Sequence, residues 1–393
     1  MTSAGAATSS GARASDRPRE MVVDLDALAH NYRAIRELVG AEVEIVPALK
    51  GNAYGHGAGP VARRLAELGV RRFATGSLAD ALAIRSASAD AQVVIFGGPL
   101  PDGLPQLVAH GFTPTVYDMA GARAVSRAAA RPTGVCVKVD AGLGRLGVAL
   151  ADAFEFVRQI RSLDHLVVEG VYTHLPFAFG SETGGSETGG SKTGGSQDAP
   201  GLAWARERLA RFDELLDALA SAGIELGMTQ ALASSAILAG LSSRATAVSP
   251  GQLLFGLAAP PGFRPVLDSI RSWLIHVHAP GPASGFGGAG TATRVGVVPV
   301  GLVDGYPSLP PASGARALIG GCSVPVLGAS LEYVSLDLSG FERARVGDEV
   351  LLLGRSGDDE IAIHDLAAWS GTLAYRLLVS LDRRIPCRYL PDA

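Results

Sequence analysis

The sequence has few cysteines, no long uninterrupted apolar run and no excess of basic residues, and each absence excludes a class of protein. Three cysteines are too few for a disulfide scaffold, and their odd number favours reduced thiols in a cytoplasmic protein. Charged residues, glycine or proline interrupt every apolar run before roughly 18 residues, so we expect no membrane-spanning helix. The balance of 34 Lys and Arg against 38 Asp and Glu argues against a broad nucleic-acid-binding surface, which needs a basic face.

The 393 residues suffice for two domains, preceded by a short arm. Residues 1–19 are small, polar and without periodicity, which is typical of a disordered segment. Residues 20–258 alternate short apolar runs with amphipathic stretches, and we expect them to form the first domain. Its predicted strands are residues 43–46, 72–74, 93–96, 112–116, 135–139, 167–172, 228–231 and 246–249. Its predicted helices are residues 25–39, 57–68, 79–87, 120–130, 152–162 and 204–221.

This alternation predicts a parallel α/β sheet in the first domain. About eight such units favour closure into a (β/α)8 barrel of the TIM type. A doubly wound open sheet is the alternative, but the chain has no glycine-rich dinucleotide-binding turn after its first strand. We therefore favour the barrel.

Residues 259–393 show a different pattern, which is typical of a mostly β C-terminal domain. Short apolar runs separated by Gly, Pro and Asp predict antiparallel strands. The predicted strands are residues 269–278, 294–300, 317–319, 324–327, 333–338, 349–353 and 385–389, with helices at residues 363–370 and 372–380.

A tandem repeat of Ser-Glu-Thr-Gly-Gly and Ser-Lys-Thr-Gly-Gly units lies within residues 180–198. Its composition predicts a flexible Gly/Ser/Thr insertion after the sixth barrel strand. We favour a tolerated surface insertion over a functional lid.

A lysine, Lys50, stands at the end of the first predicted barrel strand. In a closed and partly apolar barrel mouth, desolvation favours the neutral, nucleophilic form of an amine, which suits a Schiff base with an aldehyde cofactor. Taken alone, a lysine at a strand end is more often a solvated charge. The residues that follow overturn that interpretation, because the segment has the sequence Lys50-Gly51-Asn52-Ala53-Tyr54-Gly55-His56-Gly57.

Residues 50–57 resemble the signature K-A-[DN]-A-Y-G-H-G of the alanine racemase family, with Gly51 in place of the usual alanine. The resemblance extends over about residues 21–389. It implies an enzyme that binds pyridoxal 5'-phosphate (PLP) on a barrel followed by a β domain, the layout that the patterns predict. It further implies that Lys50 forms the Schiff base with PLP and acts as one catalytic base.

A second marker, residues 138–147, resembles the family pattern K-x-D-x-G-x-G-R-x-G at the end of the fifth strand. The resemblance implies that Arg145 contacts the phenolic oxygen of PLP and the carboxylate of the substrate. A guanidinium suits this role because its fork of donors is fixed. Lys138 matches a lysine that is often carbamylated and that orients this arginine.

Further cofactor contacts are implied by the same resemblance. His174 matches a histidine beside the cofactor ring, whereas Ser235 and Tyr375 match residues that contact the phosphate. The full cofactor-binding set is Lys50, Tyr54, His174, Ser234, Ser235, Ser249, Gly251, Gln252 and Tyr375. The substrate-binding set is Arg145, Lys138, Leu302 and Leu331.

The chain departs from the family at several of these positions, Ser234 (usually asparagine) among them. Ser249 stands where the family has an arginine that faces the pyridine nitrogen, and a hydroxyl does not force the protonation state of that nitrogen. Leu302 stands where the family has a tyrosine from the partner subunit that is the second acid/base, and leucine has no proton to transfer. We expect Tyr306, four residues later, to be a structural aromatic residue. The less favoured alternative is that Tyr306 or a water molecule serves as the second acid/base. Leu331 lies in a run that is one residue shorter than in the family, so the substrate preference is open.

Two reaction classes stay open on these residues. The first is a PLP-dependent amino-acid racemase or epimerase, in which Lys50 serves one face of Cα and a non-tyrosine group or water serves the other. The alternative is a one-faced PLP lyase, a retro-aldolase or decarboxylase acting on a β-hydroxy or α-substituted amino acid, because Leu302 replaces the second base. A PLP-binding protein without catalysis is disfavoured by the full-length β domain.

The resemblance also implies a homodimer with composite active sites, each built from one barrel and the β domain of the other subunit. We expect a small amino acid as substrate, a cytoplasmic location, and neither nucleic acid nor membrane as a partner. We expect no metal, because His276 and His278 have no third ligand at a suitable spacing.

Overall fold

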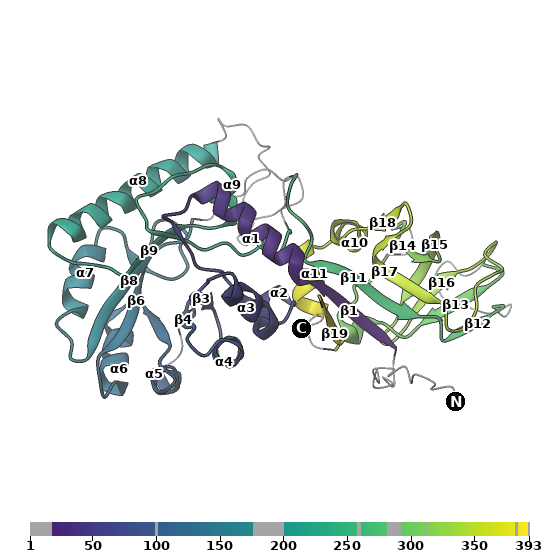
Figure 1. Ribbon diagram of the computed structural model, residues 1–393, viewed down its shortest axis with the longest axis horizontal. Helices are drawn as coiled ribbons and strands as arrows, with labels where there is room; N and C mark the ends of the chain where they lie inside the picture. Colours follow the sequence, from purple (N-terminus) through teal and green to yellow (C-terminus); the bar gives the residue numbers. More distant parts are fainter. Residues whose placement is uncertain are drawn as a thin grey trace, which may run out of the picture. The chain divides into compact units, whose positions relative to one another are not determined.

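The computed structural model describes residues 18–98, 101–175, 200–257, 261–280, 292–310, 313–381 and 384–391. The predicted insertion at 180–198 and nearly all of the predicted arm therefore lie outside the described residues. The chain divides into two compact units (Figure 1). The barrel unit comprises Val23–Asp268, Gly371–Arg383 and Cys387–Ala393, and the β unit comprises Met1–Val22, Ser269–Ser370 and Arg384–Pro386.

The barrel unit is built around eight parallel strands, which neighbour one another in the order β2-β10-β9-β8-β6-β5-β4-β3. A bridge between Ala48, just beyond β2, and Ala74 of β3 joins the two ends of this sheet. The predicted barrel is therefore confirmed, and every predicted apolar run overlaps one strand. The bounds are β2 (Glu44–Ile45), β3 (Arg72–Thr75), β4 (Gln92–Ile95), β5 (Thr113–Val116), β6 (Thr133–Asp140), β8 (Leu166–Tyr172), β9 (Met228–Leu232) and β10 (Ala247–Val248), with the short β7 (Val148–Ala149) paired to β6.

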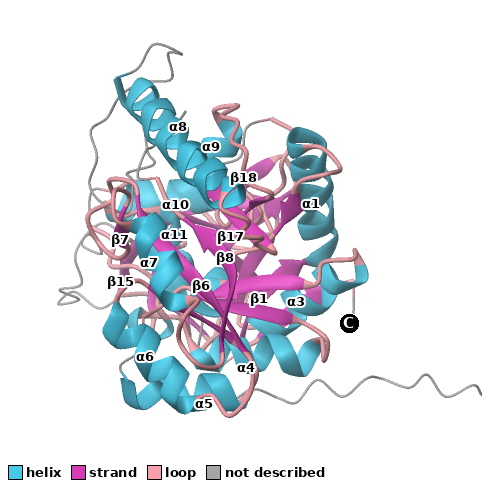
Figure 2. Cartoon of the chain, turned by 90° about the vertical axis from the view of Figure 1, so that its left-hand side faces the viewer, coloured by secondary structure: helices cyan, strands magenta, loops and turns pink. Residues whose placement is uncertain are grey.

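Helices follow the strands and lie outside them (Figure 2). Their bounds are α1 (Leu25–Val39), α3 (Ala58–Glu67), α4 (Leu78–Ala87), α5 (Leu104–Ala109), α6 (Met119–Ala128), α7 (Ala153–Ile160) and α8 (Pro200–Ser221). Along one face of α1, where the sequence spaces Leu28, Tyr32, Ile35 and Val39 as a helical stripe, the first three are buried and Val39 is partly exposed. The six-residue α5 is not predicted by periodicity, because it is too short to show a stripe. In the described part of the chain, no helix is long and apolar enough to cross a membrane.

Side chains fill the interior of the barrel. Val46, Ala74, Val94, Cys136, Tyr172, Met228 and Ala247 form one buried cluster. Tyr172 is the largest of them, and its hydroxyl lies 3.0 Å from the Thr115 hydroxyl of β5, within hydrogen-bond distance. Because the interior is packed, a binding site has to form beyond it, at the carboxyl ends of the strands.

The β unit is mostly antiparallel, as predicted, with its strands in the order β12-β13-β16-β15-β14-β17-β11 and β18 beside β17. The bounds are β1 (Arg19–Asp24), β11 (Leu267–Trp273), β12 (His276–His278), β13 (Val295–Val298), β14 (Arg316–Ile319), β15 (Cys322–Ala329), β16 (Val334–Asp337), β17 (Glu349–Ser356) and β18 (Asp359–Ile361). The chain ends with α10 (Ile363–Ser370), α11 (Ala374–Leu381) and β19 (Cys387–Leu390). The residues predicted as one strand at 269–278 form two, and a strand that begins at Arg19 is not predicted by the sequence pattern.

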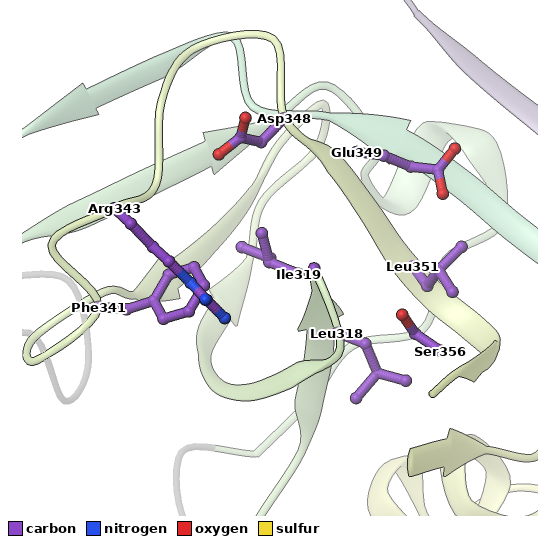
Figure 3. Close-up of a pocket in the computed structure, with 9 residues that line it drawn as sticks. Leu318, Ile319, Phe341, Arg343, Asp348, Glu349, Leu351 and Ser356 are labelled. Carbon is purple, nitrogen blue, oxygen red and sulfur yellow. The ribbon is translucent and has the colours of Figure 1, made fainter. Parts of the chain in front are cut away.

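A cavity of about 400 Å³ lies in the β unit, between the end of β14 and the start of β17 (Figure 3). It is lined by Leu318, Ile319, Gly320, Phe341, Arg343, Asp348, Glu349, Leu351 and Ser356. None of the predicted site residues, all of which are described, lines this cavity. The turn at Gly320 leads into the start of β15, whereas the loop that carries Leu331 follows the other end of that strand. The cavity is therefore separate from the predicted site.

Candidate active site

Lys50 begins α2 (Lys50–Tyr54), a single turn that directly follows the segment closing the barrel. Residues 51–54 have φ values between 53° and 61°, so the turn is left-handed. A left-handed turn costs about 1–2 kcal/mol per non-glycine residue, and such strain persists where the surrounding structure holds it. Here the Ala53 amide donates to the Leu49 carbonyl at 3.0 Å. The turn leaves the Lys50 Nζ 5.8 Å from the centroid of the Tyr54 ring.

Lys138, in β6, is 5% exposed, and its Nζ lies 4.9 Å from the centroid of the Tyr172 ring. Burial, with smaller contributions from the nearby charges of Arg145 and Lys50, lowers the pKa of this amine to about 8 against an opposing effect of Asp140. The cationic side chains of Lys50 and Arg145 therefore lie within electrostatic reach of Lys138, near the carboxyl end of β6. Such a cluster favours anionic groups of a ligand.

Asp140 shapes the loop that carries Arg145. Its Oδ1 accepts hydrogen bonds from the amides of residues 142 and 143 at 2.8 and 2.7 Å, and its Oδ2 accepts one from the amide of residue 144 at 2.8 Å. Gly142 has a φ of 125°, and a Cβ there would come within 2.7 Å of the Trp204 ring. The aspartate and the tryptophan therefore fix the path of the loop, and the exposed Arg145 follows directly.

Tyr54, Ser234 and Gly251 lie together in one small region. The Ser234 hydroxyl oxygen accepts hydrogen bonds from the amides of Gly251 and Leu253, both at 3.1 Å. A Cβ on Gly251 would lie 2.4 Å from the Tyr54 hydroxyl oxygen, so only glycine admits this close approach. The serine that replaces the usual asparagine thus ties the loop after β10 to the start of α9 (Ser234–Leu238).

Ser249 provides a test of whether PLP fits this site. Its side chain is 7% exposed, and its Oγ has no hydrogen-bond partner among the described residues. A buried hydroxyl without a partner is unfavourable, so a polar atom of a ligand beside it would restore a lost hydrogen bond. Together with the cationic cluster and the close approach of Tyr54 to Gly251, this hydroxyl fits an anionic, polar cofactor such as PLP.

The other expected cofactor residues come from the same unit. The amide of Thr173 donates to Gln230 in β9 and its hydroxyl donates to Val139 in β6, both at 2.9 Å, which places His174 at the carboxyl end of β8. Ser235 is the second residue of α9, and Gln252 directly follows Gly251. Tyr375 lies in α11, which packs against α2, since Val379 is 3.7 Å from the position of a Cβ on Gly51.

Leu302 and Leu331 come together in the β unit. The amide of Leu302 donates to the Ser330 carbonyl at 3.0 Å, and that of Val303 donates to the Leu331 carbonyl at 2.9 Å. The two leucine residues are 38% and 66% exposed. Tyr306, in contrast, is 2% exposed, its hydroxyl has no partner among the described residues, and burial raises its pKa.

The structure also bears on metal binding and on residues outside the motifs. The rings of His276 and His278 stack with centroids 4.8 Å apart, and within the described ranges no group of three or more His, Cys, Asp and Glu could hold a metal. The motifs assign no role to Asp140 or Tyr172, although both lie in segments that the resemblance covers. Trp204 carries no sequence signal for its contact with the loop.

Models of known families match both parts of the chain. The model described as alanine racemase, N-terminal domain, matches residues 23–259, and that described as alanine racemase, C-terminal domain, matches residues 274–389. Among curated relatives, the alanine racemase of Sorangium cellulosum is 31% identical over 95% of this chain and 99% of its own.

Solved structures agree with the family models. The alanine racemase from Streptomyces coelicolor superposes with a TM-score of 0.80 at 25% identity, over 95% of this chain and 98% of its own. The alanine racemase from Bacillus anthracis with bound L-Ala-P does so with a TM-score of 0.80 at 25% identity, over 95% of each chain. The chain belongs to the alanine racemase family, a family of PLP-dependent racemases.

Proposed function

We propose that the protein racemises a small amino acid with PLP bound on the barrel, Lys50 serving as the base on one face of Cα and Arg145 holding the substrate carboxylate. The observation that carries this proposal is that Lys50 and Arg145 lie close enough to the buried Lys138 for their charges to act on it. The relatives that match along nearly the whole chain bear the name alanine racemase, so alanine is the substrate that we propose first.

The described residues suit PLP group by group. Lys50 supplies the amine, and Tyr54, Gly251, Ser235 and Tyr375 would surround the phosphate. Ser234 acts mainly by holding the Gly251 loop, and the buried Ser249 hydroxyl would face the ring with His174 and Gln252 nearby. When bound, PLP supplies an electron sink that makes the Cα proton of an amino acid acidic.

The protein groups then hold the substrate and move the proton. Arg145 would fix the carboxylate through two parallel N–H···O bonds, and so decide which face of Cα meets Lys50. Lys50 takes the proton on that face with its amine lone pair. Lys138 has a pKa of about 8, so part of it is neutral near that pH, and a neutral amine can take up carbon dioxide as an anionic carbamate that would pair with Arg145.

We also propose that the protein works in the cytoplasm as a homodimer in which the β unit of one chain completes the barrel site of the other. The exposed Leu302 and Leu331 support this arrangement. Large apolar side chains gathered at one edge are typical of a surface that another chain covers.

The proposed function is tested by following Cα chemistry in deuterated water. The PLP-loaded protein is incubated with L- and D-alanine, serine and α-methylserine, and Cα deuteration, chirality and fragmentation are followed by NMR and chiral chromatography. Racemisation predicts deuterium in both enantiomers whichever one is supplied. Exchange with retention in one enantiomer, or release of formaldehyde or carbon dioxide, would overturn the proposal.

A one-faced PLP lyase is the second candidate, and one observation favours it. The residue at the position expected for the second acid/base is Leu302, which can neither accept nor donate a proton. A smaller, apolar side chain at the substrate would also leave room for a substituent on Cα or Cβ. The fragmentation products in the same experiment separate this candidate from the racemase.

A further inference from the structure

A racemisation that removes a proton from one face of Cα must return one to the other face, so it needs two groups that carry protons. In the proposed function Lys50 serves one face. Leu302, at the position expected for the second group, has no proton to give. Two tyrosines in the β unit lie near Leu302: Tyr306 is near it along the chain, and Tyr333 is near it in space. Their surroundings differ.

Tyr306 is close to Leu302 in sequence but turned into the unit. It is 2% exposed, and burial raises the pKa of its phenol. Its hydroxyl contacts no polar partner within the described part of the chain. A phenol enclosed in this way cannot reach a substrate without opening the β unit.

Tyr333 is far from Leu302 in sequence but adjacent to it in space. Ser330 joins the two residues, because its carbonyl accepts from the Leu302 amide at 3.0 Å and its amide donates to the Tyr333 carbonyl at 2.7 Å. The Ser330 hydroxyl adds two bonds, donating to the Tyr333 carbonyl at 3.1 Å and accepting from the Tyr333 amide at 3.2 Å. Residues 330–333 thus form a closed turn beside Leu302.

This turn carries its large side chains outward. Tyr333 is 42% exposed, on the same edge of the β unit as the exposed Leu302 and Leu331. The edge is tightly built, since a Cβ on Gly301 would lie 2.5 Å from the Leu331 carbonyl oxygen. Tyr333 stands on a closed turn and is joined to Leu302 through the hydrogen bonds of Ser330. Its phenol can therefore replace the phenol of the tyrosine expected at position 302.

We propose that Tyr333 of a second copy of the chain is the catalytic acid and base on the face of Cα opposite Lys50. This inference rests on the proposed racemase function. In one direction the Lys50 Nζ forms an N–H bond with the Cα proton, and the electron pair of the broken Cα–H bond stays with the substrate and its cofactor. The O–H bond of Tyr333 breaks, its proton forms the new Cα–H bond on the other face, and the electron pair stays on the phenolate oxygen.

Proton exchange with water then restores the amine and the phenol, so nothing is oxidised or reduced. In the opposite direction the phenolate takes the proton and Lys50 returns one. Glu332 lies in the same turn, and its carboxylate is the competing acid/base that the controls below distinguish from the phenol. A phenol can fill both roles, which a reversible racemisation requires.

The test uses the PLP-loaded protein and its Tyr333→Phe variant, which loses one oxygen atom from an exposed side chain. Each enantiomer of alanine is supplied in deuterated water, and racemisation and Cα deuteration are measured separately. We expect racemisation to fall by about 100-fold or more. Deuterium exchange should persist in the one enantiomer whose Cα–H faces Lys50, and the absorbance of bound PLP should be unchanged.

Glu332→Gln and Tyr306→Phe are the matched controls, and both should racemise alanine within a few-fold of the wild type. If the wild type and Tyr333→Phe racemise equally well, the role of Tyr333 is wrong while the proposed function stands. If Glu332→Gln loses racemisation instead, the carboxylate is the acid/base and Tyr333 is excluded. A wild type that exchanges one enantiomer without racemising it overturns both proposals together.

Discussion

The two edges that carry the predicted site residues differ in how firmly those residues are tied into the fold. At the barrel edge, Asp140 accepts three amide hydrogen bonds and Ser234 accepts two, so these side chains hold the backbone of the site in place. At the β-unit edge, Leu302 and Leu331 present exposed apolar side chains. Changing Asp140 or Ser234 should therefore disturb folding together with chemistry, whereas changing the exposed side chains of Leu302 or Leu331 should alter chemistry with little effect on stability.

The positions that depart from the family pattern lie at both edges. Leu302 and Leu331 lie at the edge where substitution is structurally tolerated, and Ser249 at the barrel edge has a hydroxyl with no partner among the described residues. Of the residues that hold the backbone in place, Asp140 keeps the expected type, whereas Ser234 stands where the family has asparagine. Under the proposed function, the barrel edge would hold the cofactor and the β-unit edge would decide which reaction follows.

The largest expected effect comes from removing the amine at the barrel edge. Lys50→Ala should lower racemisation by about 10⁴-fold or more, because both the attachment of PLP and one proton transfer depend on that amine. The chain has three lysines, Lys50, Lys138 and Lys192, so reductive trapping of PLP followed by peptide mapping identifies the attachment site directly. Lys192→Ala is the control and should trap as the wild type does; label on Lys138 in the wild type would contradict the assignment.

His56 should make stability at the barrel edge depend on pH. Burial lowers its pKa from 6.5 to about 4, so the folded protein keeps the ring neutral while the unfolded chain takes up a proton below about pH 6.5. Stability should therefore fall as the pH falls from about 6.5 to 4, by a few kcal/mol in total. Urea unfolding across this range should show the slope in the wild type, and His56→Gln should lack it. The exposed His364→Gln is the control, and an equal slope in all three proteins would count against a buried neutral His56.

The Arg145→Lys variant distinguishes the contribution of the paired guanidinium donors from that of the positive charge. The lysine keeps the charge but loses the two parallel donors, so we expect the KM for alanine to rise by about 10- to 100-fold, with a smaller change in kcat. Steady-state rates measured over a range of alanine concentrations give both constants. Arg161→Lys, an exposed position beyond α7, is the matched control. An unchanged KM would mean that another group holds the carboxylate.

Leu331→Asp tests whether the β-unit edge is covered by a second chain. A charge placed on a covered apolar surface should weaken the dimer by about 10-fold or more, measured by sedimentation of the variant over a range of concentrations. Val346→Asp, at a side chain that is 60% exposed in the same unit, is the control. Equal weakening of the dimer by both variants would contradict a specific role of the 330–333 turn in assembly.

The smallest effect is expected at Gly51, the residue that departs from the family signature. Its φ of 61° strains any residue with a Cβ, although the nearest side-chain atom would lie 3.7 Å away. Gly51→Ala should therefore lower the free energy of unfolding by about 1 kcal/mol. Gly201→Ala, in α8 and with open space around it, should be neutral or slightly stabilising in the same denaturant titration. A neutral Gly51→Ala would show that the left-handed turn relaxes.

The barrel could be predicted because its strands are buried on both sides and are therefore continuous apolar runs, as at residues 135–139 of β6. The left-handed turn after Lys50 could not be predicted, because Ala53 and Tyr54 ordinarily avoid positive φ. That conformation is held by hydrogen bonds and packing rather than by local preference. The pairing that joins the ends of the barrel at Ala48 and Ala74 is likewise a long-range contact.

Those site residues that lie within recognisable sequence motifs could be predicted. The convergence of Lys50, Lys138 and Arg145 follows from their places at strand ends. Distance along the chain was a poor guide in the β unit, where the near tyrosine, Tyr306, turns inward and the far one, Tyr333, lies beside Leu302. The roles of all the predicted site residues, Ser235, Gln252 and Tyr375 included, remain predictions.

Lys50 and Tyr333 belong to different compact units, and this separation has a genetic consequence. In a dimer with composite sites, a chain altered at Lys50 and a chain altered at Tyr333 form a mixed pair in which one site carries both lesions and the other carries none. If equal amounts of the two variant chains pair at random, the mixture should regain about a quarter of the wild-type activity, although each variant alone is nearly inactive. Two such alleles in one cell would complement each other within a single gene.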